Sequence, residues 1–137
     1  MGLVIAIVPA AGRGMRMGLQ GPGKQFALVG DRPVLAHTLT ALADAEAVDG
    51  IIVVTRKEQI SLAQQVVEDY AIGKVVGIIV GGDTRQESVW AGLIQLDPAT
   101  EIVVVHDGAR PLVEPAVIGR VIEAARKHGA AGAAVPV

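Results

Sequence analysis

The sequence predicts an α/β fold in which a mostly parallel β-sheet is covered by helices on both faces. Short apolar runs rich in Val and Ile recur along the chain, and segments with a helical spacing of apolar residues separate them. Continuous apolar strands are buried on both faces, which is typical of parallel sheets whose strands are connected by helices. The chain has 137 residues, a length that favours one domain, which we assign to residues 1–137.

Five apolar runs are expected to form the strands. They are Leu3–Val8, Ile51–Thr55, Val75–Val80, Ile102–His106 and Ala130–Val137. The last run ends the chain inside what is expected to be a buried strand, whereas domains usually end on exposed polar residues. We therefore expect the sequence to be a C-terminally truncated part of a longer protein, with a fold that is incomplete at that end.

Four segments between these runs are expected to be helices. Their apolar faces are Val34, Leu35, Thr38, Leu39 and Leu42; Ile60, Ala63, Val67 and Ala71; Val89, Leu93 and Leu96; and Ile118, Val121, Ile122 and Ala125. Thr84 and Glu87 have the spacing of a capping box at the start of the third helix. Pro115 fits the first turn of the fourth helix.

The composition excludes several classes of protein. The net charge is −2 without a block of like charges, which argues against nucleic acid and membrane surfaces as partners. No cysteine is available for a disulfide or a thiolate metal site. The first residues lack a secretory leader pattern, and no apolar run approaches the roughly 18 residues of a membrane span. We expect a cytoplasmic protein.

Three loops with polar residues follow predicted strands, at the edge where open parallel sheets bind ligands. The first covers Val8–Gly18 and continues through Pro22–Gln25. It is rich in glycine, and its charged residues are all cations: Arg13, Arg16 and Lys24. Because backbone N–H groups of such loops cradle phosphates, this loop indicates a highly charged phosphate ligand. The second and third loops are Gly81–Ser88 and His106–Pro111.

The first loop also resembles two other nucleotide-binding motifs, but only in part. Its glycines at positions 12, 14 and 18 differ in spacing from the G-x-G-x-x-G of dinucleotide-binding folds. Gly18 to Lys24 is close to a Walker A loop, but Gln25 replaces the magnesium-binding Ser or Thr. The interpretation that this loop only forms a turn and that its cations are solvated also stays open.

The other two loops also have structural interpretations. Gly81 to Asp83 could be a turn whose carboxylate caps the next helix. His106 could be a buried imidazole bonded to the backbone, and Trp90 could be a core residue or an interface anchor. The sequence contains no evident Ser-His-Asp set or cluster of metal ligands, so hydrolase and metalloprotease functions lack their residues.

Five motifs in order along the whole chain resemble one family. They are Pro9-Ala10-Ala11-Gly12-x-Gly14-x-Arg16-Met17-Gly18, Lys24-Gln25-Phe26, Gly81-Gly82-x-x-Arg85-x-x-Ser88-Val89-x-x-Gly92-Leu93, Val105-His106-Asp107-x-Ala109-Arg110-Pro111 and Gly132-Ala133-Ala134-Val135-Pro136-Val137. The chain resembles the 2-C-methyl-D-erythritol 4-phosphate cytidylyltransferases of the non-mevalonate isoprenoid pathway. This resemblance implies a three-layer Rossmann-like nucleotidyltransferase fold.

The resemblance also implies roles for individual residues. The nucleotide-binding residues are Pro9, Ala10, Ala11, Gly12, Gly14, Gly82, Asp83, Ser88 and Gly108, of which Gly82, Asp83 and Ser88 match the positions for cytosine and ribose. The catalytic cations are Arg16 and Lys24, Asp107 holds Mg²⁺, and Arg110 shapes the acceptor side. The family usually has Pro-Lys-Gln where this chain has Pro22 to Gln25 with one extra glycine, so we expect the loop to bulge at Gly23 for Lys24 to reach the phosphates.

The implied reaction transfers a cytidylyl group from CTP to the polyol phosphate and releases pyrophosphate. Such a transfer requires positioned cations and a divalent ion rather than a protein nucleophile. The resemblance further implies a homodimer of the full-length protein. Two alternatives stay open at this point: a sister nucleotidyltransferase acting on ribitol 5-phosphate or another sugar phosphate, and a nucleotide-binding fragment without activity.

Overall fold

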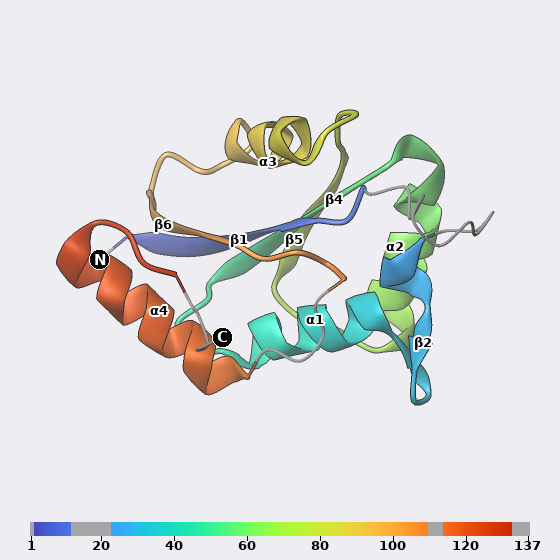
Figure 1. The fold of residues 1–137 in the computed structure, drawn as a ribbon, viewed down its shortest axis with the longest axis horizontal. Helices are drawn as coiled ribbons and strands as arrows, with labels where there is room; N and C mark the ends of the chain where they lie inside the picture. The colour runs from blue at the N-terminus through green and yellow to red at the C-terminus, as the bar shows by residue number, and fades with distance from the viewer. Residues whose placement is uncertain (1, 12–22, 110–113, 133–137) are drawn as a thin grey trace, which may run out of the picture.

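The computed structural model describes residues 2–11, 23–109 and 114–132, and within them a four-stranded parallel sheet forms the centre of the molecule (Figure 1). The sheet has the order β5-β4-β1-β6. Its strands are β1 (Leu3–Pro9), β4 (Gly50–Thr55), β5 (Val75–Val80) and β6 (Thr100–Val105). β1 pairs with β4 from Ile5 opposite Gly50 onward, and with β6 on its other side.

Helices cover both faces of this sheet, so the predicted three-layer α/β fold is confirmed (Figure 1). One face carries α1 (Val34–Asp44), α2 (Ile60–Asp69) and α4 (Pro115–His128). The other face carries α3 (Arg85–Leu93). Two short 3-10 helices, η2 (Lys24–Phe26) and η3 (Lys57–Gln59), and the small antiparallel pair β2 (Leu28–Val29) and β3 (Arg32–Pro33) complete the described elements.

The alternation of side chains along β1 explains why the whole strand is apolar. Val4, Ala6 and Val8 point into the larger core, which α1, α2 and α4 cover. Ile5 and Ile7 point into the smaller core beneath α3. Successive side chains of a strand point to opposite faces, so a central strand with helices on both faces has no solvent-facing position.

The structure confirms two of the predicted helix starts. The Thr84 hydroxyl accepts a hydrogen bond from the backbone N–H of Glu87 at 3.1 Å, which satisfies one of the unpaired donors at the start of α3. Pro115 occupies the first turn of α4, where its missing N–H costs no hydrogen bond. At the other end of α4, Gly129 takes a φ of 85° as the helix ends.

Element ends differ from the expectation in several places. The strand expected to end at His106 ends at Val105, and the third helix ends at Leu93, before Leu96. Ala130 to Gly132 form no strand because Gly and Ala fit a pleated sheet poorly, and the remainder of that expected strand lies outside the described residues. The β2–β3 pair was missed, although its Gly30-Asp31 loop is a hairpin signal.

Within the described ranges, no helix combines the length and the apolar character that a membrane-spanning segment requires.

Candidate functional site

Four separate segments meet around one cavity of about 340 Å³ at the carboxyl ends of the strands. Its lining residues are Pro9, Ala10 and Ala11 after β1; Lys24 and Gln25 in η2; Gly82, Asp83, Thr84, Arg85 and Ser88 between β5 and α3; and Asp107 and Ala109 after β6. Every described residue that the sequence assigned to the site, except Gly108, therefore lines this cavity. The edge of the sheet brings them together as the parallel topology requires.

Gly108 is buried between the two lining residues Asp107 and Ala109 of the same loop. Its N–H donates to the carbonyl of Pro9 at 3.0 Å, and its own carbonyl accepts from the hydroxyl of Thr38 at 3.1 Å. These bonds join the loop after β6 to the end of β1 and to α1. Gly108 thus anchors the loop that carries Asp107, and its assignment as a nucleotide contact stays a prediction.

Ser88 contributes a buried hydroxyl without a partner to the cavity. The residue is 1% exposed, and its Oγ makes no hydrogen bond with any described residue. The close approach of Gly81 holds it there: a Cβ on Gly81 would lie 2.8 Å from Cγ1 of Val54 and closer still to the Ser88 hydroxyl. A buried polar group without a partner is costly, and hydrogen bonding to a ligand would remove that cost.

Asp107 forms an ion pair across the cavity, which the sequence did not predict. Nε of Arg85, in the first turn of α3, lies 2.8 Å from Oδ1 of Asp107. Both side chains remain accessible to a ligand, with exposures of 59% for Arg85 and 33% for Asp107. Arg85 belongs to the third of the five motifs, so a role could have been suspected from its place in the same motif as Ser88.

Lys24 reaches the cavity through the backbone that Gly23 provides. Gly23 takes a φ of 97°, in the region that favours glycine, and the 3-10 helix η2 starts directly after it. The extra glycine of this chain therefore has a backbone conformation that favours glycine, and the bulge that brings Lys24 to the phosphates stays a prediction. The Lys24 side chain is exposed, as a cation that meets an incoming anion has to be.

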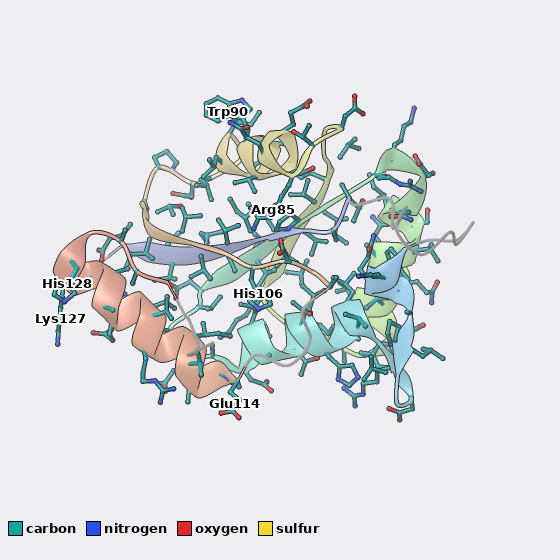
Figure 2. The ribbon with its side chains drawn as sticks, viewed as in Figure 1. Arg85, Trp90, His106, Glu114, Lys127 and His128 are labelled. Carbon is teal, nitrogen blue, oxygen red and sulfur yellow. The ribbon has the colours of Figure 1, made fainter. Side chains whose placement is uncertain are left out.

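The structure does not place every residue singled out in the sequence at the cavity. Gly12, Gly14, Arg16 and Arg110 fall outside the described residues. His106 follows the backbone-bonded interpretation, because its Nδ1 lies 2.9 Å from the carbonyl oxygen of Asp107. Trp90 is 63% exposed on the outer side of α3, so it is not a core residue (Figure 2).

Two larger hollows are lined by none of the described residues that the sequence assigned to nucleotide or metal binding. One, of about 730 Å³, is an open depression between the end of α1 and α4. The other, of about 510 Å³, runs between β6 and α4 and is lined mainly by aliphatic side chains. Size therefore does not identify the site in this molecule, and the convergence of amides, cations and carboxylates does.

Among the residues that the structure describes, no three His, Cys, Asp or Glu side chains gather around one point. The cavity instead offers the carboxylate of Asp107 at the end of a strand. This donor set does not fit zinc, which requires three or four protein ligands. It fits Mg²⁺, which is usually held by one or two carboxylates together with substrate phosphates and water.

Sequence comparison matches nearly all of the chain to one family. The profile of the 2-C-methyl-D-erythritol 4-phosphate cytidylyltransferases matches residues 4–137. The enzyme of that name from Desulforamulus reducens is 45% identical over 138 residues, covering 100% of this chain and 58% of the relative. The one from Pelotomaculum thermopropionicum is 47% identical with the same coverage. The chain thus spans a little over half the length of these relatives.

Solved structures give the same result. The crystal structure of 4-diphosphocytidyl-2C-methyl-D-erythritol synthase from Anaerococcus prevotii has a TM-score of 0.76 and 35% identity, covering 92% of this chain and 52% of that one. A CMP:2-keto-3-deoxy-manno-octonic acid synthetase is 14% identical with a TM-score of 0.67, covering 93% of this chain and 48% of that one, and shares the fold alone.

Proposed function

The chain belongs to the 2-C-methyl-D-erythritol 4-phosphate cytidylyltransferase family, and we propose that its cavity binds CTP for cytidylyl transfer to that polyol phosphate. The products are 4-diphosphocytidyl-2-C-methyl-D-erythritol and pyrophosphate, and the reaction serves the synthesis of isoprenoid precursors. One observation carries the proposal: residues from four motifs, far apart in the chain, line a single cavity at the carboxyl edge of the sheet.

The two sides of the cavity suit the two parts of a nucleoside triphosphate. Gly82, Asp83 and Ser88 form the side next to α3, where backbone groups and a hydroxyl are available to a base and a ribose. Lys24 and the backbone of Ala10 and Ala11 form the other side, which suits the phosphates. The unpaired Ser88 hydroxyl supports a ligand contact on the base side.

In the proposed reaction an oxygen of the acceptor phosphate attacks the α-phosphorus of CTP, and the bond from that phosphorus to the pyrophosphate oxygen breaks. Negative charge grows on the leaving and equatorial oxygens during this step. The ammonium group of Lys24 stabilises that charge from a fixed position, and Arg16 is proposed to act alongside it. Such preorganised charges act without a covalent enzyme intermediate.

Asp107 would hold Mg²⁺ in this reaction. A bound magnesium ion would neutralise phosphate charge and orient the triphosphate. In the ligand-free protein the Asp107 carboxylate is paired with Arg85 instead. Arg85 thereby orients the carboxylate at the cavity wall. Arg110 is proposed to contribute to the acceptor side.

Homodimerisation and a cytoplasmic location complete the proposal. The chain spans 58% of the length of its curated relatives, so the activity is best tested both in this chain and in a version extended to their length. Sedimentation of the two proteins measures whether each is a dimer.

The decisive experiment measures pyrophosphate release with Mg²⁺ and each of CTP, UTP, ATP and GTP, in the presence of 2-C-methyl-D-erythritol 4-phosphate or ribitol 5-phosphate. The proposal expects release with CTP and the methylerythritol acceptor, and a CTP affinity above that for both purine nucleotides. Equal binding of the four nucleotides would contradict the base assignment. Preference for ribitol 5-phosphate would identify a sister enzyme, and CTP binding without turnover in both proteins would identify a nucleotide-binding module.

A further inference from the structure

Two buried glutamines are bonded to each other on the phosphate side of the cavity, and one of them, Gln25, is part of the cavity lining. Gln25, in η2, is 4% exposed, and Gln59, at the end of η3, is 3% exposed. The side-chain amide of Gln25 donates to the carbonyl of Ala10 at 2.7 Å and to Oε1 of Gln59 at 3.3 Å. This chain of hydrogen bonds joins the end of β1, the 3-10 helix η2 and the segment after β4.

Both hydrogens of the Gln25 side-chain amide are bonded to acceptors within the protein. A glutamine NH₂ group has two hydrogens, and here one is directed to each of the two acceptors. Because this hydrogen bond is buried, loss of the donor would be costly: the carbonyl of Ala10 would lose that partner in a buried position. The second anchor of Ala10, its N–H bonded to the Val54 carbonyl at 2.7 Å, fixes the same residue from β4.

Gln25 follows Lys24 directly, and Ala10 precedes Ala11, so the bond joins two segments that both line the cavity. Its geometry sets how far the Lys24 backbone lies from the backbone amides after β1. We propose that Gln25 is a positioning residue, which sets the distance between the Lys24 ammonium and the phosphate-binding backbone through its bond to the Ala10 carbonyl. The ligand in this inference rests on the proposed function, whereas the positioning of the two segments does not.

The substitution Gln25→Glu provides the sharpest test, because it keeps the shape and replaces the donor. At neutral pH the introduced carboxylate cannot donate to the Ala10 carbonyl. Burial raises the pKa of a carboxyl group, so mildly acidic pH protonates it and restores one O–H donor. We therefore expect kcat to fall on the order of 10- to 100-fold at pH 8, as for other displaced catalytic groups. Relative to the wild type at each pH, the loss is expected to shrink towards pH 5.5.

Gln25→Leu removes the donor at every pH, so its loss of kcat is expected to be independent of pH. In both variants the KM for CTP is expected to change less than kcat, because a displaced Lys24 chiefly affects the transition state. Two controls separate positioning from general effects. Gln65→Glu adds a carboxylate on the exposed side of α2, and Val66→Ala weakens the core under α2. Both are expected to leave kcat and its pH profile unchanged.

A second measurement follows hydrogen exchange in the ligand-free protein. The amides of Ala10, Phe26 and Ala27 are bonded to the carbonyls of Val54, Gly23 and Lys24, and they report on the two segments directly. Gln25→Leu is expected to raise their exchange rates at least about 10-fold above the change seen in Val66→Ala. Two results would overturn the inference. One is an unchanged exchange rate at these amides in Gln25→Leu, and the other is a kcat loss in Gln25→Glu that is the same at every pH. If the wild type transfers no cytidylyl group, the proposed function fails. The exchange measurement then still tests whether Gln25 positions the two segments.

Discussion

The two faces of the sheet differ in how they are packed. On the face covered by α1, α2 and α4, side chains such as Leu35, Leu39 and Leu42 are fully buried. On the face covered by α3, the buried cluster consists of strand residues alone, and the helix contributes half-buried side chains. Trp90, on the outer side of α3, is more than half exposed (Figure 2). Ile94, directly after the helix, is exposed to a similar extent.

This difference separates stability from ligand binding. The first turn of α3 carries Arg85 and Ser88 into the cavity, yet the helix is held by the smaller cluster. The opposite face holds most of the buried apolar residues, and its helix α1 supports the loop after β6 through the bond from Thr38 to the carbonyl of Gly108. Substitutions in the densely packed face are therefore expected to change mainly the free energy of unfolding, whereas substitutions at the cavity are expected to change mainly ligand binding and turnover.

The largest effect is expected from the densely packed face. Leu39→Ala removes a fully buried side chain from α1 and is expected to lower the free energy of unfolding by about 2–5 kcal/mol. Leu93→Ala, at the half-buried end of α3, is expected to cost about 1–2 kcal/mol, since less apolar area leaves the core. Urea unfolding of both variants measures the comparison, and equal losses would show that the two faces contribute alike.

The next effect concerns the cavity and not the core. Asp107→Asn keeps the shape of the side chain and removes the charge that holds Mg²⁺ in the proposed reaction. Turnover is expected to fall at least ~100-fold, as when other preorganised charges are removed. The thermal midpoint without nucleotide is expected to change little, because the exposed pair with Arg85 contributes at most about 1 kcal/mol. Near-normal turnover would leave Asp107 as a loop residue.

A smaller loss is expected when a cation is removed from the phosphate side. Lys24→Ala is expected to lower kcat about 10- to 100-fold while the KM for CTP rises much less, because the charge acts mainly in the transition state. Lys127→Ala, at the far end of α4, serves as the control for loss of one positive charge (Figure 2). A change confined to KM would make Lys24 a nucleotide holder without a catalytic role.

Ser88→Ala tests the unpaired hydroxyl on the base side. In the free protein the substitution removes a buried polar atom that has no partner among the described residues, so stability is expected to stay equal or rise by up to about 1 kcal/mol. The affinity for CTP is expected to fall about 10-fold through the lost ligand hydrogen bond. Calorimetric titration and thermal unfolding of the same samples measure both. A stability loss with unchanged affinity would indicate a structural hydroxyl instead.

The sequence predicted the parts of the fold that local patterns determine. The Val and Ile runs of β1, β4 and β5, the capping box at Thr84 and the proline at the start of α4 all follow from period and local hydrogen bonding. The exact end of β6 and the two-residue strands β2 and β3 were not predicted. Such ends depend on which neighbour completes the backbone hydrogen bonds, and that information is not local.

For the site, motifs and topology together predicted which residues meet, but they did not predict how those residues are bonded. The pairing of Arg85 with Asp107 joins residues 22 positions apart, and the bond from Gln25 to Ala10 joins residues 15 apart. Both depend on side-chain directions that appear only after the sheet and α3 have assembled. That Ser88 has no hydrogen-bond partner among the described residues is likewise a property of the packed cavity and leaves no signal in the sequence.

The smallest effect is expected at the amino end of the sheet, away from the cavity. The backbone N–H of Gly2, 2.9 Å from the carboxylate, holds the pKa of Glu101 below its ordinary value of 4.5, and Arg126 of α4 adds to this. A carboxyl group whose pKa is lowered on folding stabilises the protein above its unfolded pKa, and that contribution disappears as the pH falls through the folded pKa. Glu101→Gln is therefore expected to flatten the loss of stability on acidification below about pH 4.5. The CTP affinity at pH 7.5 is expected to stay unchanged. Thermal midpoints of the wild type and the variant between pH 3 and 7 measure the difference, and parallel curves would show that this contact between β6 and α4 contributes nothing to folding.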